Sequence, residues 1–338
     1  MNKIYIFISI VIIVFISFIF GHYFSRLLPQ SLTNQNEYSG STPIPTPLSK
    51  YDFDNLATHQ FSEGKLTIGS KLDETENHTS YLFNFDFSPG LDDEIKTTSG
   101  QINLPSKDGK YPIVLMLRGY VDQEIYTTGL GTKSAASYFA DRGFITIAPD
   151  FLGYAQSDEN EADIFESRFQ TYTTTLSLLN SLNQIGKWDG KNIFIWGHSN
   201  GGHLAISLLE ITEKDIPTTL WAPVSKPFPY SVLYYTDESE DKGKLIRREL
   251  AKFEDIYDTD KYSITEYLDK INTTIVIHQG TNDDSVPIDW SDNLYNQLLG
   301  NNIEVTYYTY QGADHNLRPS WDEVVKRDVE FFKSQIKQ

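Results

Sequence analysis

The residues of this chain whose types could carry chemistry are a serine, two neighbouring aspartates and a histidine. Ser199 comes first, a turn with Asp283 and Asp284 begins 283 − 199 = 84 residues later, and His315 follows after a further 315 − 283 = 32 residues. A serine hydroxyl is a poor nucleophile at its ordinary pKa, so it needs a base within hydrogen-bond reach and a carboxylate that orients the base. These residue types in this order predict acyl transfer through a serine.

The serine lies in the motif Gly197-His198-Ser199-Asn200-Gly201, which follows the apolar run 193–196 and precedes a helix-like segment. A Gly-x-Ser-x-Gly motif between a strand and a helix is typical of the nucleophile elbow, where glycines permit a strained turn that raises the serine hydroxyl above a sheet. The motif therefore predicts a serine hydrolase. His198 and His203 lie beside it as packing or hydrogen-bonding residues rather than as candidates for the base.

Apolar runs alternate with helical segments over the C-terminal two thirds of the chain. Continuous apolar runs between helices indicate a mostly parallel sheet that helices cover on both faces. The expected strands are residues 113–117, 144–148, 193–196, 218–221, 274–278 and 304–308. The expected helices are residues 133–142, 162–185, 203–212, 290–299 and 321–336. The pattern predicts an α/β fold in which the candidate residues follow the ends of strands.

Two regions depart from this alternation. Residues 51–105 contain short alternating runs, including 81–87 and 100–104, between Gly, Pro and Asp turn signals. They predict antiparallel strands that either open the main sheet or form a small N-terminal β region, and they are too few for a β-propeller. Residues 227–270 are rich in tyrosine and charge. We expect them to form a cap, inserted after a strand, that covers the site and selects substrates.

From about Tyr111 to the C-terminus the chain resembles the α/β-hydrolases, and most closely the catalytic domain of the prolyl oligopeptidase family. Three motifs carry the resemblance: the elbow, a histidine loop at Gly312-Ala313-Asp314-His315, and a G-x-x-D-x-x-V-P turn at Gly280, Asp283, Val286 and Pro287. The resemblance implies the α/β-hydrolase fold and selects Asp283 over Asp284. It implies that His315 takes the proton of Ser199 and returns it to the leaving group, while Asp283 holds the imidazole in the useful tautomer.

A tetrahedral intermediate also needs donors aimed at its oxyanion, usually a backbone N–H after the serine and a second group after an earlier strand. Asn200 supplies the first. The second is expected in Leu117-Arg118-Gly119-Tyr120, where Arg118 stands in place of a histidine that many relatives have. By resemblance, Tyr120 donates through its hydroxyl or its backbone N–H; the equal alternative is that it only lines the pocket.

The predicted activity is that of a serine-type peptidase acting on peptides, because of the family resemblance. A carboxylesterase is the runner-up, since the same three residues cleave esters and one fold hosts many reactions. A third hypothesis, a non-catalytic surface binding protein, has no need of a complete Ser199, Asp283 and His315 set.

Composition narrows the possible partners. The 338 residues include 46 acidic and 28 basic side chains, a net charge of −18, which disfavours nucleic acid as a partner. There is no cysteine, so neither a disulfide nor a thiolate nucleophile is possible. The sequence contains no metal-ligand cluster, P-loop or dinucleotide fingerprint, so we expect no cofactor and no metal. The oligomeric state is left open.

The N-terminus differs from the rest of the chain. Residues 4–20 are uncharged and almost wholly apolar, and no small-residue cleavage site follows them. We expect residues 1–26 to form a single-pass membrane anchor, with a cleaved signal peptide of a secreted protein as the alternative. Residues 27–50 read as a Pro/Ser-rich linker, and residues 51–338 as the hydrolase domain, placed outside the cytoplasm.

Overall fold

A computed structural model of the chain describes residues 45–236 and 241–337. The predicted anchor and most of the predicted linker lie outside this range, so both stay predictions. Within the described residues, no helix combines the length and apolar composition that crossing a membrane requires. Residues 46–338 form one compact unit of the chain.

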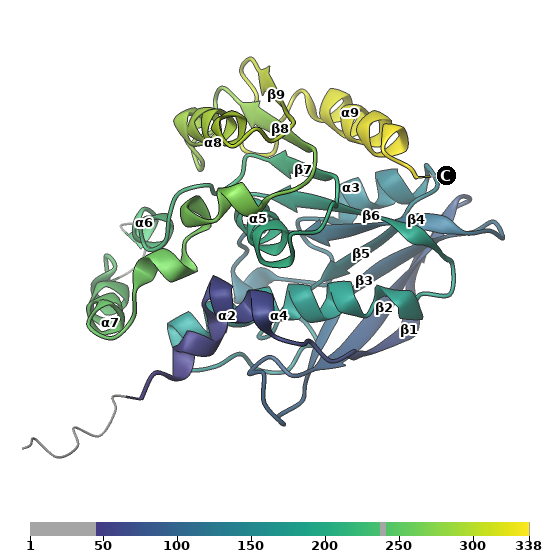
Figure 1. Ribbon diagram of the computed structural model, residues 1–338. Coiled ribbons are helices and arrows are strands. Elements are labelled where there is room, and N and C mark those ends of the chain that lie inside the picture. The colour runs from purple at the N-terminus through teal and green to yellow at the C-terminus, as the bar shows by residue number, and fades with distance from the viewer. Residues whose placement is uncertain (1–44, 237–240, 338) are drawn as a thin grey trace, which may run out of the picture. The chain divides into compact units, whose positions relative to one another are not determined.

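The unit is built on one nine-stranded sheet in the order β1-β2-β3-β5-β4-β6-β7-β8-β9 (Figure 1). The strands from β5 to β9 in that order are parallel to one another. The strand bounds are β1 Lys65–Glu74, β2 His78–Phe87, β3 Lys96–Pro105, β4 Tyr111–Leu117, β5 Ile145–Pro149, β6 Trp188–His198, β7 Thr218–Trp221, β8 Ile275–Gly280 and β9 Val305–Tyr310.

Helices connect the parallel strands, as the alternating pattern predicted. The α-helices are α2 Phe53–Thr58, α3 Lys133–Ala140, α4 Ile164–Asn180, α5 Asn200–Thr212, α6 Tyr230–Leu233, α7 Lys244–Glu254, α8 Ile288–Gly300 and α9 Trp321–Ser334. Short 3₁₀ turns are η1 Pro47–Tyr51, η2 Gln123–Ile125, η3 Leu182–Gln184, η5 Thr259–Tyr262, η6 Ile264–Glu266 and η7 Leu268–Lys270.

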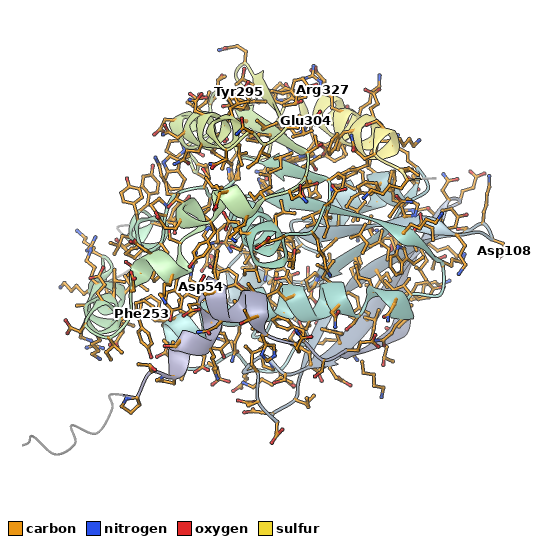
Figure 2. All side chains as sticks on the ribbon, in the orientation of Figure 1. Asp54, Asp108, Phe253, Tyr295, Glu304 and Arg327 are labelled. Carbon is orange, nitrogen blue, oxygen red and sulfur yellow. The ribbon has the colours of Figure 1, made fainter. Side chains whose placement is uncertain are left out.

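The central strands are buried on both faces because successive side chains of a strand point in opposite directions. In β4, Ile113, Leu115 and Leu117 join the cluster that contains α4 and α5 residues. Val114 and Met116 join a second cluster with residues of α3 and α9. Side chains fill the space between the sheet and its helices (Figure 2). This arrangement is the predicted α/β-hydrolase architecture, with helices on both faces of a mostly parallel sheet.

The N-terminal strands extend the main sheet rather than forming a separate layer. Strand β3 pairs antiparallel with β5, from Gly100 opposite Pro149 to Asn103 opposite Thr146. Strand β2 pairs with β3, and β1 forms the outer edge. Nearly all residues of β1 are exposed, and its pairing with β2 is irregular around Lys71.

The insertion 227–270 lies between β7 and β8 and contains α6, α7 and three 3₁₀ turns. Phe228 and Phe253 contact Phe165 of α4, with ring centroids 5.8 Å and 5.1 Å away. Phe253 lies at the opposite end of the molecule from Asp108, which follows β3 (Figure 2). The described part of the insertion is therefore fixed to the helix layer by an aromatic core.

Candidate active site

Ser199 lies where β6 ends and α5 begins, in the strained turn that the motif predicted. Its φ of +56° is in the left-handed region, which non-glycine residues rarely adopt. Its carbonyl accepts hydrogen bonds from the N–H groups of Val224 and Gly202, at 3.0 Å and 2.9 Å. A Cβ on Gly201 would stand 1.9 Å from the carbonyl oxygen of Leu117, so only glycine allows α5 to start this close to β4.

Asp283 and His315 form a hydrogen-bonded pair, each in a loop after a strand. The Nδ1 atom of His315 lies 2.9 Å from Oδ2 of Asp283, whose side chain is fully buried. Burial alone would raise the pKa of Asp283, but hydrogen bonds from His315 and from the backbone N–H groups of Val286 and Ser285 bring it below its ordinary value. An ionised Asp283 accepts a hydrogen bond from the Nδ1–H of His315, which leaves Nε2 of His315 as the unprotonated nitrogen.

Asp284 differs from its neighbour, because it is exposed and, among the residues that the structure describes, its carboxylate accepts only from the hydroxyl of Ser285, at 3.3 Å. Asp283 receives a further hydrogen bond from Gln279 Nε2, at 3.0 Å. The hydroxyl of Tyr235, in the insertion, donates to the carbonyl of Ser285 at 3.2 Å. The insertion therefore supports the turn that carries Asp283.

His198 joins the serine turn to the histidine loop. Its ring centroid lies 4.7 Å from that of His315, and its Nε2 lies 2.9 Å from the His315 carbonyl oxygen. Burial, and then the proximity of His315, lowers the pKa of His198 to about 4. His198 is therefore neutral near pH 7, and its Nε2–H donates to the carbonyl. The motif placed His198 beside the site, but its partner comes from a loop 117 residues away.

The structure brings His315 against His198, the residue that precedes Ser199, but no hydrogen bond joins His315 to Ser199 itself. The hydroxyl of Ser199 makes no hydrogen bond to any residue that the structure describes. Catalytic hydrogen bonds are often long without substrate and tighten in the Michaelis complex. Asp283 favours the His315 tautomer with a proton on Nδ1, and His198 holds His315 next to the serine turn. Both features favour proton transfer from Ser199 to His315.

The expected oxyanion donors lie on the other side of the serine. A Cβ on Gly119 would stand 2.9 Å from Cβ of Ser199, so the turn after β4 touches the serine. The hydroxyl of Tyr120 donates to Asp122 at 2.8 Å, and this bond, followed by burial, raises the pKa of Tyr120 to about 12. The backbone N–H groups of Tyr120 and Asn200 donate to no described residue. These two N–H groups, rather than the Tyr120 hydroxyl, are available to an oxyanion here.

A buried cluster missed by sequence reasoning holds this turn. Arg118 is 5% exposed and donates to the carbonyl oxygens of Gly119 and Asp150, at 3.0 Å and 2.7 Å. Its guanidinium stacks on Tyr126 and Tyr154, with distances to the ring centroids of 4.4 Å and 4.1 Å. The side chain that replaces the family's histidine thus fixes the backbone beside Ser199.

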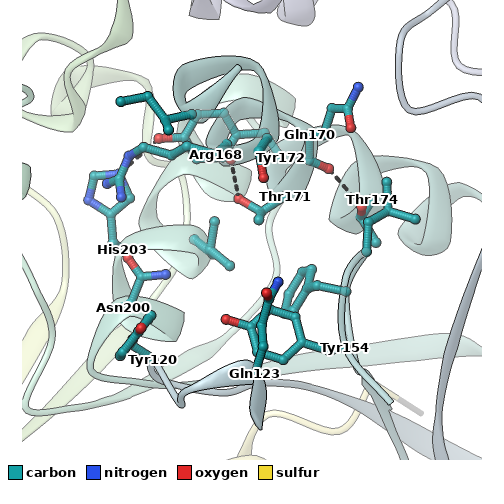
Figure 3. A pocket seen from close by; sticks show the side chains of 15 residues that line it. Tyr120, Gln123, Tyr154, Arg168, Gln170, Thr171, Tyr172, Thr174, Asn200 and His203 are labelled. Carbon is teal, nitrogen blue, oxygen red and sulfur yellow. Dashed lines mark hydrogen bonds between the residues drawn. The ribbon is translucent and has the colours of Figure 1, made fainter. Parts of the chain in front are cut away.

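A cavity of about 250 Å³ opens beside the elbow (Figure 3). Tyr120 and Asn200 line it together with side chains of α4, and Tyr154 lies across from them. It shares Tyr120 and Tyr154 with a wider outer groove. Within the described residues, the insertion 227–270 contributes nothing to the lining of either space, and no group of His, Asp and Glu side chains has the arrangement of a metal site.

The model of the prolyl oligopeptidase family matches residues 131–338, which is more than half of the chain and includes Ser199, Asp283 and His315. The chain belongs to the prolyl oligopeptidase family. It is therefore a serine hydrolase with the α/β-hydrolase fold, as the sequence motifs predicted.

Relatives of this family member include esterases. The acetyl esterase Axe7A of Xylanibacter ruminicola is 22% identical over 266 residues, which are 72% of this chain and 59% of that protein. The chain thus spans about three fifths of the length of this curated relative. This match is a similarity of sequence, and the activity in its name is that of the relative.

Solved structures share the fold. Acetyl xylan esterase 1 of Thermoanaerobacterium sp. is 16% identical, with a TM-score of 0.61, and the match covers 87% of this chain and 96% of that one. The acetyl xylan esterase of Paenibacillus sp. R4, also 16% identical, has a TM-score of 0.63 and coverage of 86% and 96%. A puromycin-hydrolyzing peptidase of Mycobacterium tuberculosis, 16% identical, has a TM-score of 0.54 and coverage of 80% and 39%.

Proposed function

We propose that this protein is a serine esterase that removes short acyl groups through an acyl-enzyme at Ser199. The observation that carries the proposal is the surroundings of Ser199. The residue before it, His198, contacts His315 of the Asp283–His315 pair, and the turn that touches Ser199 leads to the unengaged Tyr120 N–H, with that of Asn200 next in the chain. The adjoining cavity of about 250 Å³ lies just below the volumes of about 300–1,000 Å³ typical of drug-sized ligands. A space of this size suits a small acyl or alcohol group.

The mechanism assigns one role to each residue. Nε2 of His315 takes the proton from the Ser199 hydroxyl as its oxygen attacks the ester carbonyl, while Asp283 stabilises the imidazolium. The N–H groups of Asn200 and Tyr120 donate to the oxyanion of the tetrahedral intermediate. The intermediate collapses when His315 protonates the departing alcohol, and water activated by His315 then releases the acid.

The comparisons support an ester over the peptide that the sequence favoured. The two acetyl xylan esterase structures are matched over 96% of their own length, and the curated relative is named as an acetyl esterase. The peptidase structure is matched over only 39% of its length. A peptidase remains the second candidate, because of the family description and that structure.

Substitution of Ser199 tests the proposal. The full chain is treated with a fluorophosphonate probe, and hydrolysis of 4-nitrophenyl acetate is compared with that of prolyl and alanyl 4-nitroanilides. We expect labelling and ester turnover in the wild type, and loss of both in Ser199→Ala. Ser207→Ala is the matched control, because Ser207 lies on the same helix as the serine turn and its hydroxyl donates to the His203 carbonyl.

Two results would replace the proposal. Turnover of the anilides in preference to the acetate would make the protein a peptidase. A folded wild type that is not labelled and hydrolyses neither substrate would support the non-catalytic binding protein.

A further inference from the structure

The cavity beside the elbow contains one ionic charge, and it is positive. Fifteen residues line the cavity, and none of them is an aspartate or a glutamate. Arg168, in the second turn of α4, extends along the cavity wall toward His203 (Figure 3). The acidic side chains Asp122, Glu124 and Glu161 line only the outer groove.

The neighbours of Arg168 do not neutralise it. Burial, and then Arg168 itself, lowers the pKa of His203 to about 3, so this histidine is uncharged. Burial raises the pKa of Tyr172, whose hydroxyl lies 3.0 Å from Nε2 of His203. Tyr172 therefore also stays neutral, so neither neighbour carries a negative charge that would offset the guanidinium of Arg168.

No carboxylate of the described residues forms an ion pair with Arg168, although the chain has 46 acidic and 28 basic residues. Its Nε atom is buried and has no hydrogen-bond partner among them. Two other arginines, Arg248 and Arg327, pair with glutamates of their own helices. Arg168 is half-buried, and its guanidinium interacts with the uncharged hydroxyl of Tyr172. Since a buried donor without a partner costs free energy, the Nε–H of Arg168 is a donor whose partner is missing.

We propose that Arg168 binds a carboxylate of the substrate, so that the preferred esters carry a carboxylate close to the scissile bond. This inference rests on the proposed function in one respect, that the substrate occupies this cavity. A guanidinium offers planar, paired donors that match the two oxygens of a carboxylate, and charge-assisted bonds are stronger than neutral ones. The acidic side chains of the outer groove disfavour an anion there, whereas the inner cavity holds the positive charge of Arg168.

Matched substrates test the inference. The 2-, 3- and 4-acetoxybenzoates are compared with the corresponding acetoxybenzamides, which have the same acetyl group and nearly the same size but no charge. For at least one isomer we expect the wild type to show a KM about tenfold lower for the carboxylate, the size of one charge-assisted hydrogen bond. Arg168→Gln removes this difference, and Arg168→Lys retains part of it.

Arg142→Gln is the matched control. Arg142 is exposed, donates to the Tyr138 carbonyl and lies over the Tyr138 ring, so its loss changes the net charge equally without reaching the cavity. This variant should keep the preference of the wild type. Thermal melting establishes whether each variant folds. If Arg168→Gln does not fold, the comparison of carboxylate and amide is made with Arg168→Lys.

Binding without turnover separates this inference from the proposed function. Calorimetry measures the affinity for benzoate and benzamide in Ser199→Ala and in Ser199→Ala with Arg168→Gln. Benzoate binding that needs Arg168 in a protein that cleaves no ester would leave the anion site standing and remove the esterase. Equal affinities for benzoate and benzamide, together with equal KM values for all three substrate pairs, would overturn the anion site and leave the esterase untouched.

Discussion

A neutral histidine next to the serine has a defined task at the scale of single residues. His198 contributes its Nε2–H to the carbonyl of His315, at 2.9 Å, and its ring packs on the imidazole of the base. It touches neither the ester nor the oxyanion in the proposed mechanism, so it is a positioning residue. The basic nitrogen of His315 is thereby held from two sides, through Asp283 and through the backbone.

We expect His198→Ala to lower kcat/KM for 4-nitrophenyl acetate by about fivefold, the effect of one lost hydrogen bond of about 1 kcal/mol. His198→Gln carries an N–H at a similar distance from the backbone and should recover most of the activity. The rate of fluorophosphonate labelling measures the same positioning without product release. Equal activity of the two variants would show that packing alone matters at this position.

The neutral state of His198 also predicts how activity depends on pH. Since the pKa of His198 is about 4, its charge does not change above about pH 5, so the acid limb of the activity profile belongs to another group. The pH dependence of kcat/KM in His198→Gln should therefore follow that of the wild type between pH 5 and 8. If the acid limb of kcat/KM lies at a different pH in His198→Gln than in the wild type, His198 is not neutral over this range.

At the scale of elements, the contact between the turn after β4 and the start of α5 positions Ser199 against its oxyanion donors. Gly119→Ala places a Cβ 2.9 Å from Cβ of Ser199, which pushes the Tyr120 N–H away from the oxyanion. We expect a loss of about 100-fold in kcat, comparable to removal of one oxyanion donor. Gly186→Ala, where a Cβ meets nothing within 4 Å, is the control and should have wild-type kcat. Wild-type kcat in Gly119→Ala would place the donors elsewhere.

The elements that sequence could predict are those whose burial leaves a local pattern. Strand β7, Thr218–Trp221, has the predicted bounds because it is buried on both faces and no charged residue interrupts its short run of threonine and apolar side chains. Helix α4 ends at Asn180, five residues before the predicted end, where the 3₁₀ turn Leu182–Gln184 follows. Strand β1 was not predicted, since it is exposed on both faces and exists by pairing with β2.

The residues of the site also differ in whether a local sequence pattern could predict them. Ser199, Asp283 and His315 lie in turns whose glycines and prolines are visible in the sequence, so motifs could nominate them. The position of Arg168 depends on how α4 packs across the first turn of α5, a contact between segments about 30 residues apart that no local pattern contains. The support that Tyr235 gives to the Asp283 turn likewise arises only from tertiary packing.

At the scale of the whole molecule, buried ionisable groups act on stability in opposite directions. The pKa values of His198 and His203 are lowered, so the unfolded chain binds more protons and the free energy of unfolding falls as pH drops from about 6.5. The pKa of Asp283 is also lowered, so Asp283 likewise makes the free energy of unfolding fall as the pH drops, but at a lower pH. Glu210 has the opposite sign, because burial raises its pKa well above the ordinary value and stability falls as pH rises.

Glu210 is 2% exposed, and neither carboxylate oxygen has a hydrogen-bond partner among the described residues. We expect Glu210→Gln to raise the melting temperature by a few degrees at pH 8 and to change it less at pH 5, since burial raises the pKa of Glu210 and the cost of burying this side chain grows as the pH rises. Glu213→Gln, on the exposed end of the same helix, is the control and removes only a surface pair with Lys270. A variant that melts at the same temperature as the wild type at both pH values would show that folding does not raise the pKa of Glu210.

The outer edge of the sheet has a consequence for behaviour in concentrated solution. An unpaired strand edge can recruit the edge of another molecule and start aggregation. Strand β1 opposes this by its composition and shape, because Lys65, Lys71, Asp73 and Glu74 place charge along it and its register with β2 shifts twice near Lys71. The exposed strand that sequence reasoning missed therefore protects the sheet against intermolecular strand addition.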